Sequence, residues 1–82
     1  MKATITHVDL KRGMYAAQID ETEDFVIFEL LDSQEVELND RIEHQNFYSM
    51  GGETFKNLTQ DFTFEVFVED VCGKNLVKTR CF

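Results

Sequence analysis

Apolar and other side chains alternate with a period of two through FTFEVFVEDV, residues 62–71. Successive side chains point to opposite faces of a β-strand, so this run predicts a strand with one buried face. Phe67 falls on the other face, among polar groups. No long stretch of the chain shows the 3.6-residue period of an amphipathic helix, so we predict an all-β protein. The buried face is expected to carry Phe62, Phe64, Val66 and Val68.

Four more segments, rich in β-branched and aromatic residues, are predicted as strands: residues 2–10, 14–20, 25–31 and 41–50. The alternation in the first segment slips at His7, which indicates a β-bulge or a sharp bend. Gly13 favours a tight turn after it, because glycine adopts positive φ without strain. The third segment is apolar almost throughout and is expected to be covered on both faces. The polar residues 32–40 are expected to form a loop with at most one short helical turn.

Five short strands with a bent first strand predict a closed or partly open small barrel, in which closure removes the strand edges that promote aggregation. The five-stranded OB-fold is the expected architecture. The 82 residues allow one domain, which we assign to residues 1–72 as a single OB-like β-barrel. Residues 73–82 are expected to form a tail or a short edge strand through Leu76 and Val77.

Two of the four glycines lie in SMGGETFKNLTQ, residues 49–60, and raise the question of a phosphate-binding loop. A Walker-type loop needs Lys directly after its last Gly, then Ser or Thr, and a helix behind it. Lys56 instead comes four residues after Gly52, and the next predicted element is a strand. We therefore interpret the segment as a connection between the fourth and fifth strands. Its Met50 and Phe55 are expected to cap the core or to present a contact surface, and we favour the cap.

The formal net charge is −8, and it is unevenly distributed. Residues 20–70 carry a net charge of −13, whereas residues 1–19 carry +2 and residues 71–82 carry +3. An acidic body repels polyanions such as duplex DNA, because their binding depends on Lys and Arg displacing counterions. A basic protein surface is the partner that this charge favours.

The chain has no run of 18 apolar residues and no unbroken apolar stretch near its start. No membrane span, no membrane partner and no signal peptide are therefore expected. Two cysteines, Cys72 and Cys81, are few for a disulfide-stabilised secreted domain. We expect reduced thiols and a cytoplasmic location, while a bridge between the two cysteines stays open.

The segments ATITHVDLKRGMYAAQID and DFVIFEL resemble the first three strands of cold-shock domains over about the first 30 residues. Arg12-Gly13 is similar to the basic-Gly turn of that family, and residues 24–28 fall on its second aromatic cluster. The resemblance implies an OB-like barrel that binds single-stranded nucleic acid by stacking bases on exposed rings. Tyr15 and Phe28 are the remaining stacking candidates, and each missing ring removes about 1–3 kcal/mol of stacking per base. The chain departs from the family, which has aromatic residues at these positions, at His7, Met14, Ala16 and Val26.

The candidate contact residues are basic or aromatic: Lys11, Arg12, Tyr15, Phe28, Lys74, Lys78 and Arg80. No catalytic residue, cofactor or metal site is predicted. His7 and His44 have no cysteine or second histidine at ligand spacing, and sixteen carboxylates make near pairs common by chance. A barrel of this size has no deep cleft unless it oligomerises, so we expect a protein that is not an enzyme.

The preferred hypothesis is a small non-enzymatic interaction module whose acidic surface meets a protein partner. The first alternative is cold-shock-like binding of single-stranded nucleic acid, which the charge disfavours. The second alternative is self-assembly through an edge strand or through the apolar tail. The oligomeric state is left open.

Overall fold

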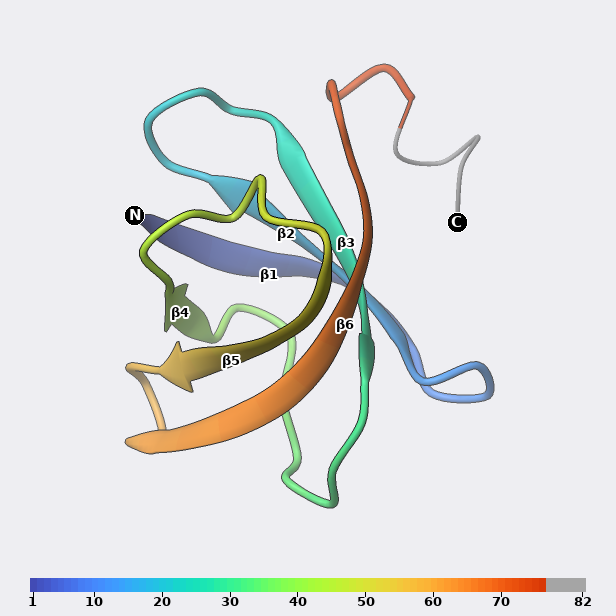
Figure 1. Ribbon diagram of the computed structural model, residues 1–82, viewed down its shortest axis with the longest axis vertical. Helices are drawn as coiled ribbons and strands as arrows, with labels where there is room; N and C mark the ends of the chain where they lie inside the picture. The colour runs from blue at the N-terminus through green and yellow to red at the C-terminus, as the bar shows by residue number, and fades with distance from the viewer. Residues whose placement is uncertain (77–82) are drawn as a thin grey trace.

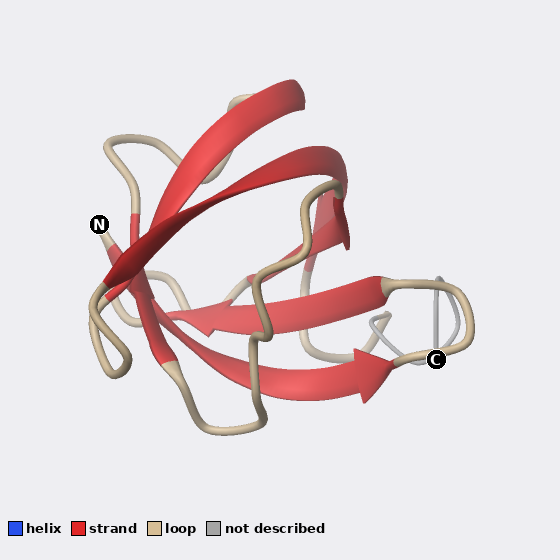
Figure 2. Cartoon of the chain, turned by 90° about the horizontal axis from the view of Figure 1, so that it is seen from below, coloured by secondary structure: helices blue, strands red, loops and turns tan. Residues whose placement is uncertain are grey.

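Six β-strands form a closed barrel in the computed structural model, which describes residues 1–76 (Figure 1). The strands are β1 (Lys2–Asp9), β2 (Met14–Ile19), β3 (Phe25–Leu30), β4 (Arg41–Glu43), β5 (Gly51–Asn57) and β6 (Phe62–Cys72). Their order around the barrel is β1-β2-β3-β6-β5-β4, and β4 pairs with β1 to close the ring. Every neighbouring pair is antiparallel. Residues 1–76 contain no helix (Figure 2), so the predicted all-β class is confirmed, with six strands instead of five.

β1 contains the irregularity that the slip at His7 predicts. Its register with β2 shifts between Ile5 and His7, so Thr6 is the extra residue of a β-bulge. A bulge bends the strand. After the extra residue the alternation shifts by one, so even-numbered side chains face inward where odd-numbered ones did before. Val8 can therefore pack against the interior cluster that Ile5 joins before the bulge.

The segment with the glycine pair is itself a strand, so its interpretation as a connection is wrong. It forms β5, which pairs with β6 along its whole length. Phe55 is fully buried within the barrel, as a core residue of this strand. Met50 directly precedes the strand and is 51% exposed, so it does not cap the core.

The strand predicted at residues 41–50 is formed only over Arg41–Glu43. Asn46 turns the chain, because its side-chain oxygen accepts a hydrogen bond from the Tyr48 amide at 2.9 Å. Phe47 of this loop is fully buried and packs edge-on against Phe55, with ring centroids 5.1 Å apart. An apolar side chain that favoured a strand thus reaches the core from a loop.

β3 is covered on both faces, as its apolar sequence predicts. Val26 and Phe28 belong to the main cluster inside the barrel. Residues of the opposite parity join a smaller apolar cluster on the outer face: Phe25 and Ile27, with Ala16 and Cys72. On β6 the alternation also holds, since Phe64, Val66 and Val68 are buried and Phe67 is exposed.

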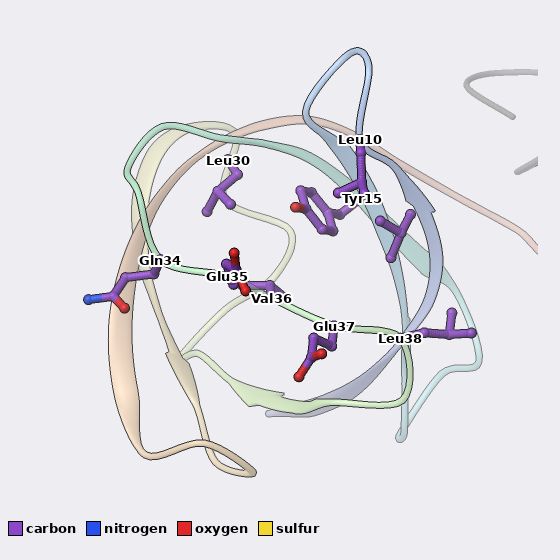
Figure 3. Close-up of a pocket in the computed structure, with 9 residues that line it drawn as sticks. Leu10, Tyr15, Leu30, Gln34, Glu35, Val36, Glu37 and Leu38 are labelled. Atoms are coloured by element: carbon purple, nitrogen blue, oxygen red, sulfur yellow. The ribbon is translucent and has the colours of Figure 1, made fainter.

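Residues 31–40 join β3 to β4 and are called the crossover below. They cross one open end of the barrel (Figures 2 and 3) and contain no helical turn. Val36 is 4% exposed and packs on the interior cluster, so it plugs this end of the barrel. The end of the crossover continues the β1 ladder, because Asn39 donates its amide to the Ile5 carbonyl at 2.8 Å and the Ile5 amide donates to the Asp40 carbonyl at 2.9 Å.

The chain beyond β6 forms a turn as far as it is described. The Leu76 amide donates to the Gly73 carbonyl at 2.9 Å, so no edge strand begins before Leu76. The predicted positions Val77, Lys78, Arg80 and Cys81 lie outside the described residues. Within residues 1–76, no helix is long and apolar enough to cross a membrane.

Candidate functional site

One end of the barrel opens into a mostly apolar pocket of about 510 Å³, called the end pocket below (Figure 3). Val8, Leu10 and Tyr15 contribute from the β1–β2 hairpin, Leu30 from the end of β3, and residues 34–38 from the crossover. This volume falls within the range of about 300–1,000 Å³ that is typical of ligand-binding pockets. Segments distant in sequence therefore build one cavity at the barrel end.

The hairpin turn carries the most exposed apolar residue of the lining. Leu10 is 78% exposed at the start of the turn. The Arg12 guanidinium donates to the Asp9 carboxylate at 2.8 Å, and this hydrogen bond is the main cause that lowers the pKa of Asp9. Gly13 closes the turn with a φ of 64°, and its carbonyl accepts a hydrogen bond from the Leu30 amide at 3.0 Å. The hairpin side and the β3 side of the pocket are thereby joined.

Asp40 holds the crossover against the turn between β5 and β6. It is 5% exposed, and its Oδ2 accepts hydrogen bonds from the Glu37 amide at 2.9 Å, from Asn57 Nδ2 at 2.8 Å and from Gln60 Nε2 at 2.6 Å. Gln60 also donates to the Glu35 carbonyl at 3.2 Å. Buried carboxylates with several donors impose one backbone geometry. Asp40, Asn57 and Gln60, called the Asp40 cluster, therefore position the pocket-forming part of the crossover.

Tyr15 lines the end pocket and brings a hydroxyl group to it. Its ring is stacked on Phe28 with centroids 5.6 Å apart, and the residue is 4% exposed. Figure 3 shows its hydroxyl pointing across the barrel end, and no hydrogen bond within residues 1–76 uses it. Burial, and then the charge of Glu35, raise the pKa of Tyr15 above its ordinary value of 10.0. The hydroxyl therefore keeps its proton at neutral pH and can both donate and accept.

The charges around the end pocket are asymmetric. Glu35 and Glu37 are exposed on the crossover side. Lys11 and Arg12 follow Leu10 on the hairpin side, where Arg12 is engaged with Asp9. A ligand is therefore met by negative charge from the crossover and by positive charge from the hairpin turn.

Within residues 1–76, the basic and aromatic residues singled out in the sequence lie in different parts of the barrel. Tyr15 and Phe28 are 4% and 0% exposed, so neither ring offers a face on which a base could stack. Lys11 and Arg12 are exposed in the hairpin turn, which lies at the right of Figure 1, whereas the segment that contains Lys74 follows β6 at the top of that view. The basic hairpin turn and Lys74 thus lie apart. Lys78 and Arg80 lie outside the described residues.

The sequence reasoning missed the apolar residues that matter most at the end pocket. Leu10 and Leu38 are 78% and 56% exposed, and both line it. A signal for them existed, because each is a large aliphatic residue within a polar turn or loop, in DLKRG and VELND. Exposed aliphatic groups that gather on one surface mark interaction sites more often than isolated ones do.

Metal ligands do not gather within residues 1–76, where no group of three His, Cys, Asp or Glu side chains is arranged to hold an ion. Both ring nitrogens of His44 have partners within the fold. Its Nδ1 accepts from the Asn46 amide at 2.9 Å, so the ring proton sits on Nε2, which is 2.8 Å from a Glu53 carboxylate oxygen. The pair ties the loop after β4 to β5.

A comparison of the chain with protein-family models finds no match, and searches of curated proteins and of solved structures also find none.

Proposed function

We propose that this protein is a small non-enzymatic interaction module that binds a protein partner through the end pocket. The observation that carries the proposal is the exposure of Leu10 and Leu38 at the mouth of an apolar cavity. A lone exposed leucine needs no explanation, but two beside one apolar pocket form a surface that gains free energy when it is covered.

The composition of the end pocket supports binding over catalysis. Its lining holds one tyrosine, one glutamine and two glutamates among aliphatic residues. It has no histidine, cysteine, serine or lysine, the side chains that most often act as nucleophiles or as general bases near neutral pH. An apolar wall with few polar groups is typical of a recognition site.

Single-stranded nucleic-acid binding is the weaker candidate. A small closed antiparallel barrel is compatible with the OB-like architecture that the resemblance to cold-shock domains implies. The buried rings of Tyr15 and Phe28 and the net charge of −8 argue against it, since such binding needs exposed rings within a basic groove. Both the OB-like assignment and a cytoplasmic location remain predictions.

The test compares two variants with the same charge change at equally exposed positions. Leu38 and Met50 are 56% and 51% exposed, and only Leu38 lines the end pocket. A partner captured from cell extract and then purified is titrated by calorimetry against the wild type, Leu38→Asp and Met50→Asp. We expect Leu38→Asp to weaken binding at least about tenfold, as expected for truncation of an interface hot spot, and Met50→Asp to leave it unchanged. Absence of any partner, or equal binding by both variants, contradicts the proposal.

A further inference from the structure

The walls of the end pocket suit the side chain of a larger molecule better than a small apolar ligand. Leu10 and Leu38 line the cavity, but 78% and 56% of their surfaces remain exposed to water. A small molecule held inside would leave both leucines in water. A polypeptide segment that lies across the barrel end covers them while one of its side chains fills the cavity.

The base of the end pocket holds an unused hydrogen-bonding group. Tyr15 is 4% exposed, and no hydrogen bond within residues 1–76 occupies its hydroxyl (Figure 3). The hydroxyl oxygen itself is accessible to water from the pocket, because no buried side-chain oxygen within residues 1–76 lacks a hydrogen-bond partner. A backbone carbonyl or amide beside the entering side chain would replace that water.

The charge at the rim favours a cation on one side of the entering segment. Glu35 and Glu37 both border the cavity from the crossover, and Figure 3 shows Glu35 over the barrel end close to Val36. Within residues 1–76, the Glu37 carboxylate accepts only a long hydrogen bond, 3.4 Å, from Gln60 Nε2. Both glutamates belong to the body of the chain, residues 20–70, which carries a net charge of −13. On the crossover side of the pocket, long-range attraction and local pairing therefore both favour a positive charge.

We infer that the end pocket recognises a cationic amphipathic protein segment. One bulky aliphatic or aromatic side chain inserts between Leu10, Leu30 and Leu38. A Lys or Arg a few residues away pairs with Glu35 and Glu37, and a main-chain group of the segment bonds the Tyr15 hydroxyl. This inference rests on the proposed function and specifies the chemistry of the partner.

Four synthetic peptides of equal length test the inference. They combine a central Leu or a central Ser with flanking Lys or flanking Glu residues. Each is titrated into the isotopically labelled wild-type protein, and NMR amide and methyl shifts report where it binds. The same titrations use Glu35→Lys and a matched control, Glu21→Lys, which makes the same charge change in the β2–β3 turn. Tyr15→Phe tests the hydroxyl, and its NMR spectrum checks that the fold is retained.

We expect only the Leu–Lys peptide to bind the wild type with saturable shifts at Val8, Leu30 and Leu38. Glu35→Lys should weaken it about two- to fivefold, as for loss of an exposed charge pair, whereas Glu21→Lys should change its affinity less than twofold, by the screened long-range charge effect alone. Charge reversal should also let Glu35→Lys bind the Leu–Glu peptide. Tyr15→Phe should weaken the Leu–Lys peptide several-fold, because one hydrogen bond is lost.

Several outcomes overturn the inference. For the peptides, these outcomes are equal affinities of the Ser–Lys and Leu–Lys peptides, or tighter binding of a peptide with flanking Glu. For the variants, they are equal losses of affinity in Glu35→Lys and Glu21→Lys, or an affinity in Tyr15→Phe equal to that of the wild type. Binding of a small apolar compound, or of a second copy of the chain, in the pocket also overturns the inference. If a natural partner needs Leu38 but presents an acidic or uncharged segment, the inference fails and the proposed function stands. If no partner depends on Leu38, both fail.

Discussion

Gly51 and Gly52 are neighbours at the start of β5, yet only one of them has a positive φ. Gly51 has a φ of 88°, a conformation that L side chains rarely adopt. Gly52 does not have a positive φ, and a Cβ added there would meet no atom within 4 Å. Only the first glycine is therefore required by the fold. The second glycine raises the conformational entropy of the unfolded chain and is not needed for the backbone conformation of the folded state.

We expect Gly52→Ala to raise the free energy of unfolding by about 0.4–1 kcal/mol, because it restricts the unfolded chain without strain. Gly51→Ala should lower that free energy by about 1–2 kcal/mol, since it forces a Cβ into the left-handed region. Urea denaturation followed by circular dichroism measures both. Equal effects of the two substitutions would contradict the backbone assigned to this pair.

Asp20 and Arg41 form a bidentate ion pair between the end of β2 and the start of β4. Nη1 and Nη2 of the guanidinium donate to the two carboxylate oxygens at 2.9 and 2.6 Å. These hydrogen bonds are the main cause that lowers the pKa of Asp20 below its ordinary value of 3.8. A carboxyl group whose pKa is lower in the folded state stabilises the fold above its ordinary pKa. That contribution is lost as the pH falls through the folded-state pKa.

Arg41→Gln is expected to return the pKa of Asp20 toward its ordinary value, which NMR titration of the carboxyl carbon measures directly. The side chains of the pair are 44% and 39% exposed, so the change in stability at neutral pH should stay within about 1 kcal/mol. Lys56→Gln is the control, because its ion pair with Asp61 lies elsewhere. An Asp20 pKa that is the same in the wild type and Arg41→Gln would refute the assignment of the pair.

At the scale of elements, the crossover is held in position by side-chain hydrogen bonds and not by regular secondary structure. It spans residues 31–40 without a strand or helix, and the Asp40 cluster holds its end. Removal of the carboxylate leaves the buried Asn57 amide without its acceptor, and an unsatisfied buried donor costs more than the hydrogen bond itself contributes.

Asp40→Ala should therefore lower the free energy of unfolding by about 2–3 kcal/mol, the range for loss of hydrogen bonds to a buried charge. Asp61→Asn is the control, because the Asp61 side chain is 87% exposed and Asn tolerates the positive φ of 61° at this position, so it should change stability by less than about 0.5 kcal/mol. Hydrogen exchange at the Asn39 amide, which is bonded to the Ile5 carbonyl, should accelerate in Asp40→Ala alone. Similar denaturation midpoints for the two variants would mean that the Asp40 cluster does not hold the crossover.

At the scale of the whole molecule, the net negative charge favours a protein partner and disfavours nucleic acids. The net charge is −8, and the two rings that the cold-shock resemblance singles out are inside the barrel. We expect short fluorescent DNA and RNA oligonucleotides to show no binding even at low salt, where attraction between unlike charges is strongest. Fluorescence anisotropy at two salt concentrations measures this, with a basic single-strand-binding protein as positive control. Salt-sensitive binding that Lys11→Glu abolishes would restore the nucleic-acid hypothesis.

Much of the barrel was predictable where a strand has one buried face. The inward residues of β6, the two covered faces of β3 and the irregularity at His7 all follow from alternation or from its interruption. β5 was not predictable in this way, because GGETFKN has few apolar residues and becomes a strand by pairing with β6. Phe47 misled the prediction of the fourth strand, since burial of a ring does not require a strand.

The candidate site was much less predictable. Tyr15 and Phe28 were expected at a contact surface, but alternation alone does not say which face of a strand becomes the interior of a barrel. Closure of the ring places both rings inside, where Tyr15 exposes little more than a hydroxyl to the end pocket. Lys11 and Arg12 are exposed, and they border the pocket only through their neighbour Leu10.

The amino-acid sequence by itself determined the all-β class, the alternating faces of β6, the irregularity in β1 and the acidic charge. These are local or additive properties of the chain, so neighbouring residues suffice to define them. Only the tertiary structure decided that Leu10 and Leu38 border the same cavity and that Glu35 lies near the Tyr15 hydroxyl. The reason is that barrel closure and the path of the crossover bring together residues whose separation in sequence carries no signal of their contact.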